Sequence, residues 1–339
     1  MAQSVNILVT GAAGFIGWKV CEFLLTKPQL IPNDIMTNDS MTVHIIGIDN
    51  LNDYYDVRLK QWRLDQLQRF THFTFQKLDI EHYQDVKALF EKYNFDAVIN
   101  LAARAGVRYS MENPFVYYTT NVMGTLNLLE LCREFNVEKF ILASTSSLYA
   151  GQKMPFKEDL PVNEPISPYA ASKKSAEATC FTYHHLYDID ISILRYFTVY
   201  GPASRPDMSP LRFISWVYQK KPVVIYGDGN QSRDFTYVDD IARGTIMALK
   251  PLGFEVINLG SDKPYKLLKF LHLIEEKLGK KAKIVHESSH PADMQATWAD
   301  IQKAERILEW RPEIDINAGI VNSVQWLLDN DALTKVIHL

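Results

Sequence analysis

The stretch that decides the fold is VNILVTGAAGFIG, residues 5–17. An apolar, β-branched run over Val5–Thr10 leads straight into a glycine-rich loop, and a helical pattern begins at residue 15. Glycines at these spacings permit a tight turn, close approach of backbone amides to a diphosphate, and close packing of helix on strand. The positive end of the helix dipole would face the phosphates. The segment predicts a dinucleotide-binding loop, with contacts from Gly11, Gly14, Phe15, Ile16 and Gly17.

Beyond this loop, short apolar strands alternate with longer helical patterns over the first two hundred residues. The strands are apolar throughout, which is typical of a sheet covered by helices on both faces. This alternation predicts an α/β fold, a Rossmann-type doubly wound parallel sheet whose ligands bind beyond the carboxyl ends of the strands. The predicted strands are Val5–Thr10, Val43–Asp49, His72–Lys77, Ala97–Leu101, Phe140–Ser144 and Ile189–Tyr196, and the predicted helices are 15–27, 56–69, 82–93, 115–136 and 168–187.

The pattern changes after residue 197. Turn-rich stretches, GPASRPDMSP at 201–210 and YGDGNQSRDF at 226–235, separate short strands from helices. We expect a smaller C-terminal α/β substrate-binding lobe. Its expected elements are strands at 223–226 and 255–259 and helices near 236–250, 265–280 and 316–330. The predicted domains are 1–197, with 228–252 packing back on it, and a lobe of 198–227 and 253–339.

Composition narrows the classes of function. The chain has 339 residues, 47% of them hydrophobic, with a formal charge of −4 and no basic tail, which argues against nucleic acid or membrane partners. The apolar stretch at 7–25 contains Lys19 and Glu22, so we do not interpret it as a signal or membrane segment. Three cysteines without a CxxC pair predict reduced thiols in a cytoplasmic protein, and we expect no metal site.

The second predicted strand ends in IGIDN, residues 46–50. A carboxylate at Asp49 would accept hydrogen bonds from the adenosine ribose and repel a 2′-phosphate, which predicts NAD rather than NADP. The interval from Gly17 is longer than the usual spacing of about 20 residues, and an inserted loop at 28–42 explains the difference. Asp79 either faces the adenine or caps the next helix. The further expected cofactor contacts are Asn50, Asp79, Ile80 and Ala102.

The segment SPYAASK, residues 167–173, predicts the catalytic pair. Pro168 suits the first turn of a helix, and Tyr169 and Lys173 lie one turn apart on the same face. Tyrosine has an ordinary pKa of about 10, and a neighbouring ammonium together with an oxidised nicotinamide would favour its phenolate form. A fifth strand that ends in STSS, residues 144–147, adds hydroxyl groups nearby.

These residues resemble the extended short-chain dehydrogenase/reductase family over nearly the full chain. The resemblance rests on TGAAGFIG at 10–17, NLAA at 100–103, Asn121, the hydroxyl cluster and the YxxxK motif. Within that family the chain is most similar to nucleotide-sugar 4-epimerases, and most of all to UDP-glucuronate 4-epimerases. The stretches that carry this similarity are GIDNLNDYYDVRLK at 47–60, AGVRYS at 105–110, RYFTVYGPASRPDM at 195–208 and GDGNQSRDFTYVDD at 227–240.

The resemblance implies NAD-dependent epimerisation of a UDP-sugar at C4, through a 4-keto intermediate and with tightly bound NAD. Tyr169 would remove the 4-hydroxyl proton, Lys173 would hold the nicotinamide ribose, and Thr145 would hydrogen-bond the reacting oxygen. Asn121 would support the site, and His290 departs from the Arg or Gln that relatives often have there. The implied substrate contacts are Arg108, Ser146, Ser147, Thr198, Arg205, Arg233 and Asp293.

Arg205 is the candidate that would distinguish a uronate from a neutral hexose, because guanidinium binds carboxylate with two parallel hydrogen bonds. The alternative is that Arg205 pairs with Asp207 or another surface acid. The resemblance also implies a homodimer formed through the helices at 115–136 and 168–187.

Other activities remain open at this point. A UDP-glucose or UDP-N-acetylhexosamine 4-epimerase would use the same residues. Related dehydratases and decarboxylases place acidic residues where this chain has Ser146 and Ser147, which argues against both. A redox-sensing NAD-binding protein without catalysis would commonly lack the Tyr or Lys, and this chain has Tyr169 and Lys173.

Overall fold

The computed structural model describes residues 4–36, 42–289 and 293–337. Seven parallel strands form the main sheet in the order β10-β6-β5-β4-β1-β2-β3, and the strand order reverses between β1 and β4. This order confirms the doubly wound parallel sheet predicted from the alternating pattern. The strands are β1 Ser4–Thr10, β2 Thr42–Asp49, β3 Phe73–Lys77, β4 Ala97–Asn100, β5 Lys139–Thr145, β6 Asp190–Tyr196 and β10 Phe254–Leu259.

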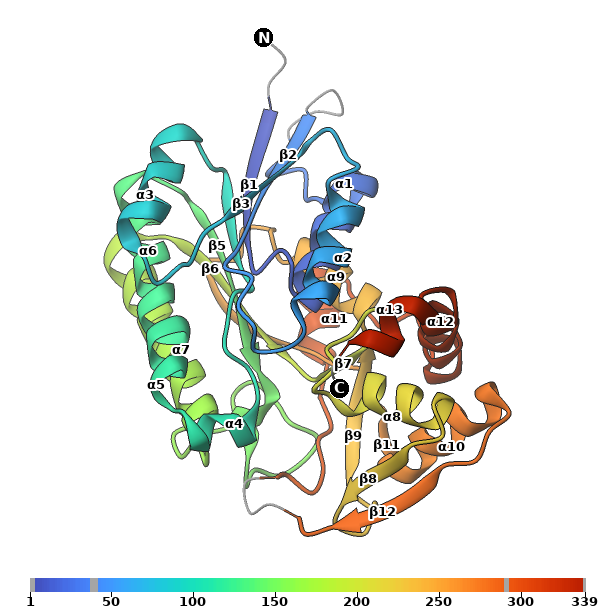
Figure 1. Cartoon of the computed structure of the whole chain (residues 1–339). Coiled ribbons are helices and arrows are strands. Elements are labelled where there is room, and N and C mark those ends of the chain that lie inside the picture. The colour runs from blue at the N-terminus through green and yellow to red at the C-terminus, as the bar shows by residue number, and fades with distance from the viewer. Residues whose placement is uncertain (1–3, 37–41, 290–292, 338–339) are drawn as a thin grey trace.

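Helices cover both faces of this sheet (Figure 1). On β1, Val5, Ile7 and Val9 pack into one core cluster, whereas Leu8 packs into the other, as the alternation of side chains along a strand requires. The first cluster includes residues of α1 Phe15–Thr26, α2 Val57–Leu67 and α9 Val238–Met247, and the second includes residues of α3 Tyr83–Lys92, α6 Thr125–Glu134 and α7 Pro168–Tyr187. No helix in the described parts of the chain is long and apolar enough to span a bilayer.

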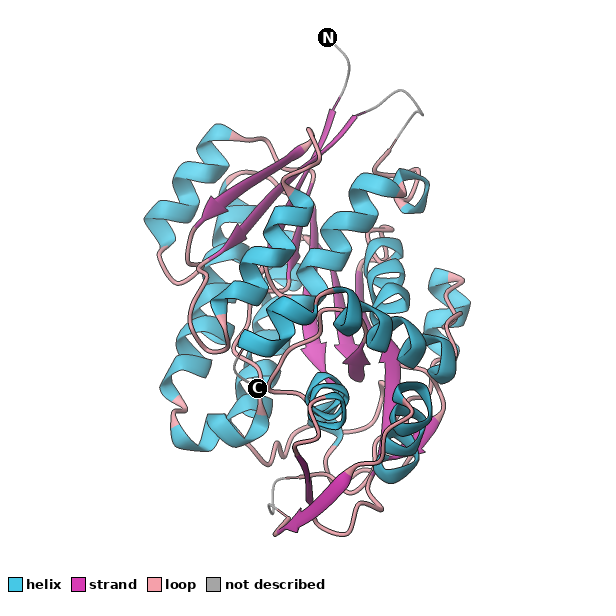
Figure 2. Ribbon diagram, turned by 45° about the vertical axis from the view of Figure 1, so that its right-hand side comes forward, coloured by secondary structure: helices cyan, strands magenta, loops and turns pink. Residues whose placement is uncertain are grey.

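A smaller lobe lies beyond the carboxyl ends of the main strands (Figure 2). It contains a three-stranded sheet in the order β11-β9-β7 and a parallel pair of β8 and β12. Its strands are β7 Thr198–Tyr200, β8 Pro222–Tyr226, β9 Ser232–Tyr237, β11 Pro264–Lys266 and β12 Lys283–Glu287. Its helices are α8 Ser209–Tyr218, α10 Leu267–Leu278, α12 Ile316–Asp329 and the short α13 Asp331–Val336, whereas the short α11 Gln302–Leu308 packs against β10 and α9 of the main domain.

Two predictions about this second half need correction. Residues 254–259 belong to the main sheet, because β10 pairs with β6 over its whole length, although we assigned them to the lobe. The stretch 226–235, expected as a turn, contains most of β9, which pairs with β7 and β11 and places Arg233 on a strand. We predicted that residues 228–252 pack on the first domain. Within this stretch the helix α9 does so, because it lies against α1.

The helix expected at 115–136 is interrupted. It consists of α5 Phe115–Tyr117, a π-helical segment Tyr118–Gly124, and α6. A short helix, α4 Val107–Glu112, precedes it. The π segment carries Asn121, and π-helical turns are frequent at functional sites. In the predicted insertion, Pro28–Leu30 forms a single 3-10 turn, while 37–41 lie outside the described residues.

Candidate active site

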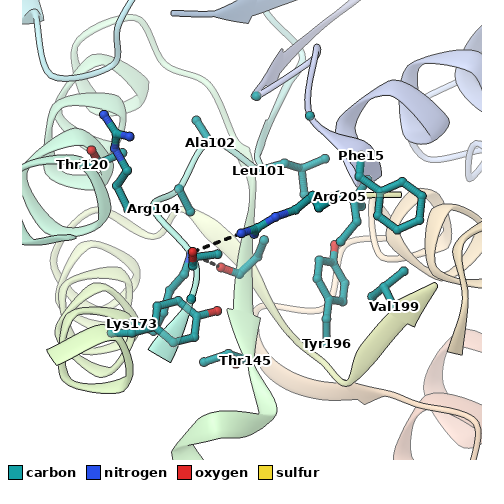
Figure 3. Close-up of a pocket in the computed structure, with 18 of the residues that line it drawn as sticks. Phe15, Leu101, Ala102, Arg104, Thr120, Thr145, Lys173, Tyr196, Val199 and Arg205 are labelled. Atoms are coloured by element: carbon teal, nitrogen blue, oxygen red, sulfur yellow. Dashed lines mark hydrogen bonds between the residues drawn. The ribbon is translucent and has the colours of Figure 1, made fainter. Parts of the chain in front are cut away.

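A single cavity of about 470 Å³ gathers nearly all of the predicted site residues at the carboxyl ends of the main strands. Figure 3 shows Lys173 and Thr145 on one side of it, with Arg205 reaching toward its middle. Of the predicted catalytic, cofactor and substrate contacts, all of which are described, Arg108 alone does not line the cavity. The predicted residues that line it are Gly11, Gly14, Phe15, Ile16, Gly17, Asp49, Asn50, Asp79, Ile80, Ala102, Thr145, Ser146, Ser147, Tyr169, Lys173, Thr198, Arg205, Arg233 and Asp293.

The glycine-rich loop forms a cradle that fits a diphosphate. Gly11 has a φ of +67°, and a Cβ at Gly17 would lie 2.1 Å from the Gly11 carbonyl oxygen, so neither position accepts a larger residue without strain. Gly14 is the N-cap of α1 and has no side chain that could bond the first-turn amides. These amides therefore remain for an anionic ligand, which the positive helix end favours.

Asp49 closes the other end of this dinucleotide site. Its Oδ1 accepts a hydrogen bond from the Leu51 amide at 2.8 Å, and the side chain is buried at the cavity wall. Lys60 of α2, which the sequence did not single out, lies beside it with Nζ 3.9 Å from Oδ1. A carboxylate at the end of the second strand fits an adenosine ribose diol.

Asp79 is not the N-cap of α3, a position held by His82. Its Oδ1 accepts the Glu81 amide at 3.0 Å and its Oδ2 accepts Asn50 Nδ2 at 2.7 Å. Asp79 therefore organises the turn before the helix while it lines the cavity. Its predicted contact with the adenine stays a prediction.

The catalytic pair lies at the start of α7. Pro168 occupies the first turn of this helix, as the sequence predicted, and Ser167 caps the helix by accepting the Ala170 amide at 3.2 Å. Lys173 Nζ is buried and donates to the Ala143 carbonyl oxygen at 2.9 Å, and burial lowers the pKa of Lys173 to about 8. The pair thus lies against the end of β5, where the hydroxyl cluster follows.

The pKa of Tyr169 is raised by burial, and the groups that oppose this rise are a hydrogen bond with Thr145 and the charge of Arg205. We expected Lys173, together with a bound nicotinamide, to favour the phenolate, and this effect stays a prediction. In the structure Lys173 directs its ammonium toward the Ala143 carbonyl.

Behind Lys173 lies a buried ion pair that sequence analysis missed. Glu177, one turn further along α7, accepts two hydrogen bonds from the Arg195 guanidinium at 2.8 and 2.9 Å and one from Ser144 Oγ at 2.6 Å. The Glu177 carboxylate raises the pKa of Lys173 against the larger effect of burial. A YxxxKxxxE spacing, read as one helix face, was the available signal.

Asn121 holds the loop that follows β4. Its Oδ1 accepts the Arg104 amide at 2.8 Å, and its Nδ2 donates to the Arg104 carbonyl and to Ser172 Oγ at 3.0 and 2.9 Å. The π segment therefore ties the β4–α4 loop to α7, one residue before Lys173. This geometry agrees with the supporting role that the resemblance implies.

The sequence left two alternatives for Arg205, a place in the substrate site or an ion pair with Asp207. It lines the cavity, and its guanidinium also makes two hydrogen bonds to Asp207 at 3.0 and 2.5 Å and one to the Ala105 carbonyl oxygen at 3.2 Å. Its charge lies 5.4 Å from the Tyr54 ring centroid. The pairing with Asp207 is therefore present, at the cavity and not at a remote surface.

The remaining predicted contacts lie toward the lobe. Arg108 forms an ion pair with Asp293 and lies 3.6 Å from the Tyr226 ring centroid. Arg233, which donates to the Ser232 carbonyl oxygen at 2.8 Å, lines both the main cavity and an adjoining one of about 220 Å³, as does Asp293. The prediction about His290 falls outside the described residues.

Comparison with known proteins identifies the family. The model of the GDP-mannose 4,6 dehydratase family matches residues 8–322. The chain belongs to this family. It is an extended short-chain dehydrogenase/reductase, as the motifs suggested.

Relatives of the chain include epimerases. A UDP-glucuronate 4-epimerase of Thermodesulfobacterium geofontis is 55% identical over 98% of this chain and 99% of its own length. The crystal structure of UDP-glucuronic acid 4-epimerase from Bacillus cereus, in complex with UDP-glucuronic acid and NAD, is 38% identical, with a TM-score of 0.87, and covers 96% of this chain and 99% of that one. A UDP-glucose 4-epimerase of Thermotoga maritima with UDP-glucose is 28% identical, with a TM-score of 0.83 over 96% and 99% of the two chains.

Proposed function

We propose that this protein interconverts UDP-glucuronate and UDP-galacturonate by NAD-dependent epimerisation at C4, through a transient 4-keto sugar. The observation that carries the proposal is the arrangement of one cavity. The glycine cradle, Asp49, the three residues Thr145, Tyr169 and Lys173, and the cationic Arg205 and Arg233 all line it. The similarity to UDP-glucuronate 4-epimerases over nearly the whole chain supports it.

In this mechanism Tyr169 takes the proton of the sugar 4-hydroxyl, and Thr145 hydrogen-bonds the same oxygen. Bound NAD supplies the chemistry of hydride acceptance at C4 and hydride return on the other face, so no cofactor is consumed. Thr145 also accepts the Ser147 amide at 3.1 Å, which fixes its hydroxyl beside Tyr169. Lys173, held by the Ala143 carbonyl, positions the nicotinamide ribose.

The proposed substrate contacts form two groups, one for the sugar and one for the nucleotide and diphosphate. Ser146, Ser147, Thr198 and Arg205 would receive the sugar and its C6 carboxylate. Neutral hydroxyls at 146 and 147 leave no general acid for dehydration or decarboxylation. The proposed nucleotide and diphosphate contacts are Arg108, Arg233 and Asp293.

One observation favours a second candidate, a UDP-glucose 4-epimerase. Asp207 offsets the charge of Arg205 with two hydrogen bonds, so the cavity at this point is nearer neutral than an unpaired guanidinium would make it. A neutral hexose would need only hydroxyl partners at C6. We rank the uronate first because the guanidinium still lines the cavity.

We also propose a homodimer in the cytoplasm. Large apolar side chains are exposed on the helices expected to pair, with Phe115 79% exposed on α5 and Phe181 54% exposed on α7. Burying such a surface against a second copy would be favourable. The three cysteines are buried free thiols, which suits a reducing compartment.

We propose that residues 1–197 together with α9 and β10 bind the dinucleotide. The lobe, which includes β9 and most of the chain after β10, would bind the nucleotide sugar.

The deciding experiment is product analysis. The purified protein is incubated separately with UDP-glucuronate, UDP-glucose and UDP-N-acetylglucosamine, and each product is identified by chromatography and mass spectrometry. We expect UDP-galacturonate from the first, with bound NAD and no added cofactor. A protein that holds NAD but converts none of the three sugars would support the redox-sensor alternative and overturn the proposal.

A further inference from the structure

Lys60 is a buried cation at the cofactor end of the cavity. Its side chain is 5% exposed, yet the residue lines the cavity wall. Its polar neighbours are Asn52 Oδ1 at 3.3 Å and Asp49 Oδ1 at 3.9 Å. Among the described residues, Asp49 is the only carboxylate within 4.0 Å of Lys60 Nζ. An ammonium has three donors, so this one is incompletely satisfied by the protein.

The surroundings of Lys60 are strongly cationic. Its pKa is lowered to about 8, mainly by burial, with the charges of Arg63, Arg104 and Arg205 acting in the same direction and Asp49 opposing them. Arg63 is fully buried and donates to the carbonyl oxygens of Ala13 and Ala203 and to a tyrosine hydroxyl, not to an acid. Asp207 offsets the charge of Arg205, and Asp49 is the carboxylate beside Lys60 itself.

We propose that Lys60 is a latent receptor for the 2′-phosphate of NADP, and that Asp49 suppresses it in two ways. The Asp49 carboxylate repels the phosphate and also neutralises the ammonium that would bind it. This inference rests on the proposed binding of a dinucleotide with its adenosine ribose at Asp49. Lysine binds phosphate as a point charge, and a buried ammonium is held more strongly by a phosphate than an exposed one.

The inference makes the cofactor preference depend on a pair of residues. Removing Asp49 alone should admit NADP, because the receptor is already present. Removing Lys60 as well should abolish that gain. If Lys60 serves only as a structural counterion of Asp49, the second removal should not change NADP binding.

The test measures bound cofactor and does not depend on epimerase activity. Wild type, Asp49→Ala, Lys60→Met and Asp49→Ala/Lys60→Met are each incubated with equimolar NAD and NADP. After removal of free cofactor, acid releases the bound dinucleotides, and chromatography quantifies both. The matched control is Asp49→Ala/Lys77→Met, because Lys77 is the register partner of Asp49 on β3 but does not line the cavity.

We expect wild type and Lys60→Met to hold NAD almost exclusively. Asp49→Ala should raise the ratio of NADP to NAD at least about tenfold, since one charge-assisted contact corresponds to about tenfold to a hundredfold in affinity. The Lys60→Met change should return that ratio toward wild type, and Lys77→Met should not. Asp49→Ser gives the same comparison if the alanine variant does not fold.

Two results would overturn the inference. The first is a double variant with Lys60→Met that holds as much NADP as Asp49→Ala. The second is a folded Asp49→Ala or Asp49→Ser protein that keeps NAD and takes no NADP. A wild-type protein that binds neither dinucleotide would instead refute the proposed function.

Discussion

Replacing Arg205 with alanine tests whether this residue recognises the sugar carboxylate. A charge-assisted hydrogen bond contributes roughly 1.5–3 kcal/mol, so the variant should lose about tenfold to a hundredfold in kcat/KM for UDP-glucuronate. We expect a value near the lower end, because the guanidinium already donates twice to Asp207 and once to the Ala105 carbonyl. For UDP-glucose the direct loss should be absent.

The assay must separate this contact from an effect on the base. The charge of Arg205 also lowers the pKa of Tyr169, so its removal should slow turnover of both sugars. That common loss cancels in the ratio of kcat/KM for UDP-glucuronate to kcat/KM for UDP-glucose. The ratio, measured for wild type and variant at one pH, should fall about tenfold or more.

Two further variants sharpen the result. Arg205→Lys keeps the charge but loses the planar fork, and it should recover turnover of UDP-glucose more fully than selectivity for the uronate. Asp207→Asn frees the guanidinium from its counterion and should increase that selectivity. Equal losses for the two sugars in Arg205→Ala, with no change in Asp207→Asn, would show that Arg205 acts through Tyr169 and does not contact a carboxylate.

Three other variants test the base, the support behind it and the cofactor cradle. Tyr169→Phe should reduce turnover by a factor of about 10² to 10⁴ while NAD stays bound, and wild-type rates would refute its role as base. Glu177→Gln should lower the free energy of unfolding in urea by about 3–5 kcal/mol, because the buried Arg195 guanidinium loses its counterion, whereas Glu134→Gln, in an exposed pair, should change that free energy much less. Since Glu177 raises the pKa of Lys173, the same variant should also move the alkaline limb of the pH–rate profile to lower pH. Gly17→Ala should abolish copurifying NAD because its Cβ would lie 2.1 Å from the Gly11 carbonyl, whereas Gly279→Ala, with no atom within 4 Å, should cost about 1 kcal/mol and keep the cofactor.

Most of the fold could be predicted from short stretches of the sequence. The first six strands are mostly apolar, and α7 begins where Pro168 predicts, because helix-start and strand propensities act within a few residues. The partner of β10 could not be predicted in this way, since its pairing with β6 joins segments about sixty residues apart. The same reason hides β9, whose glycine-rich approach at Gly227 and Gly229 looks like a turn until β7 and β11 flank it.

The same difference between local and long-range signals decides which residues of the candidate site could be predicted. Gly11, Asp49 and Tyr169 stand in motifs whose spacing reflects contiguous geometry, and the structure brings all three to one cavity. Lys60 and Glu177 stand among other charged residues on helices, where a sequence pattern predicts a solvated face. Their burial depends on partners contributed by other strands and loops, which no local pattern contains.

The position of Lys173 shows how spacing can place a residue correctly and still leave its effect undetermined. A separation of four residues fixes the helix face that Tyr169 and Lys173 share, but it does not fix where a flexible ammonium points. Here the Ala143 carbonyl holds it on the side of β5, and the charge of Arg205, on a loop beyond β7, lowers the pKa of Tyr169. Arg205 therefore takes part both in the proposed recognition of the sugar and in the tuning of the base. A uronate that binds Arg205 would offset the charge that favours the phenolate, and so the acidity of the substrate and the pKa of Tyr169 are coupled through one side chain.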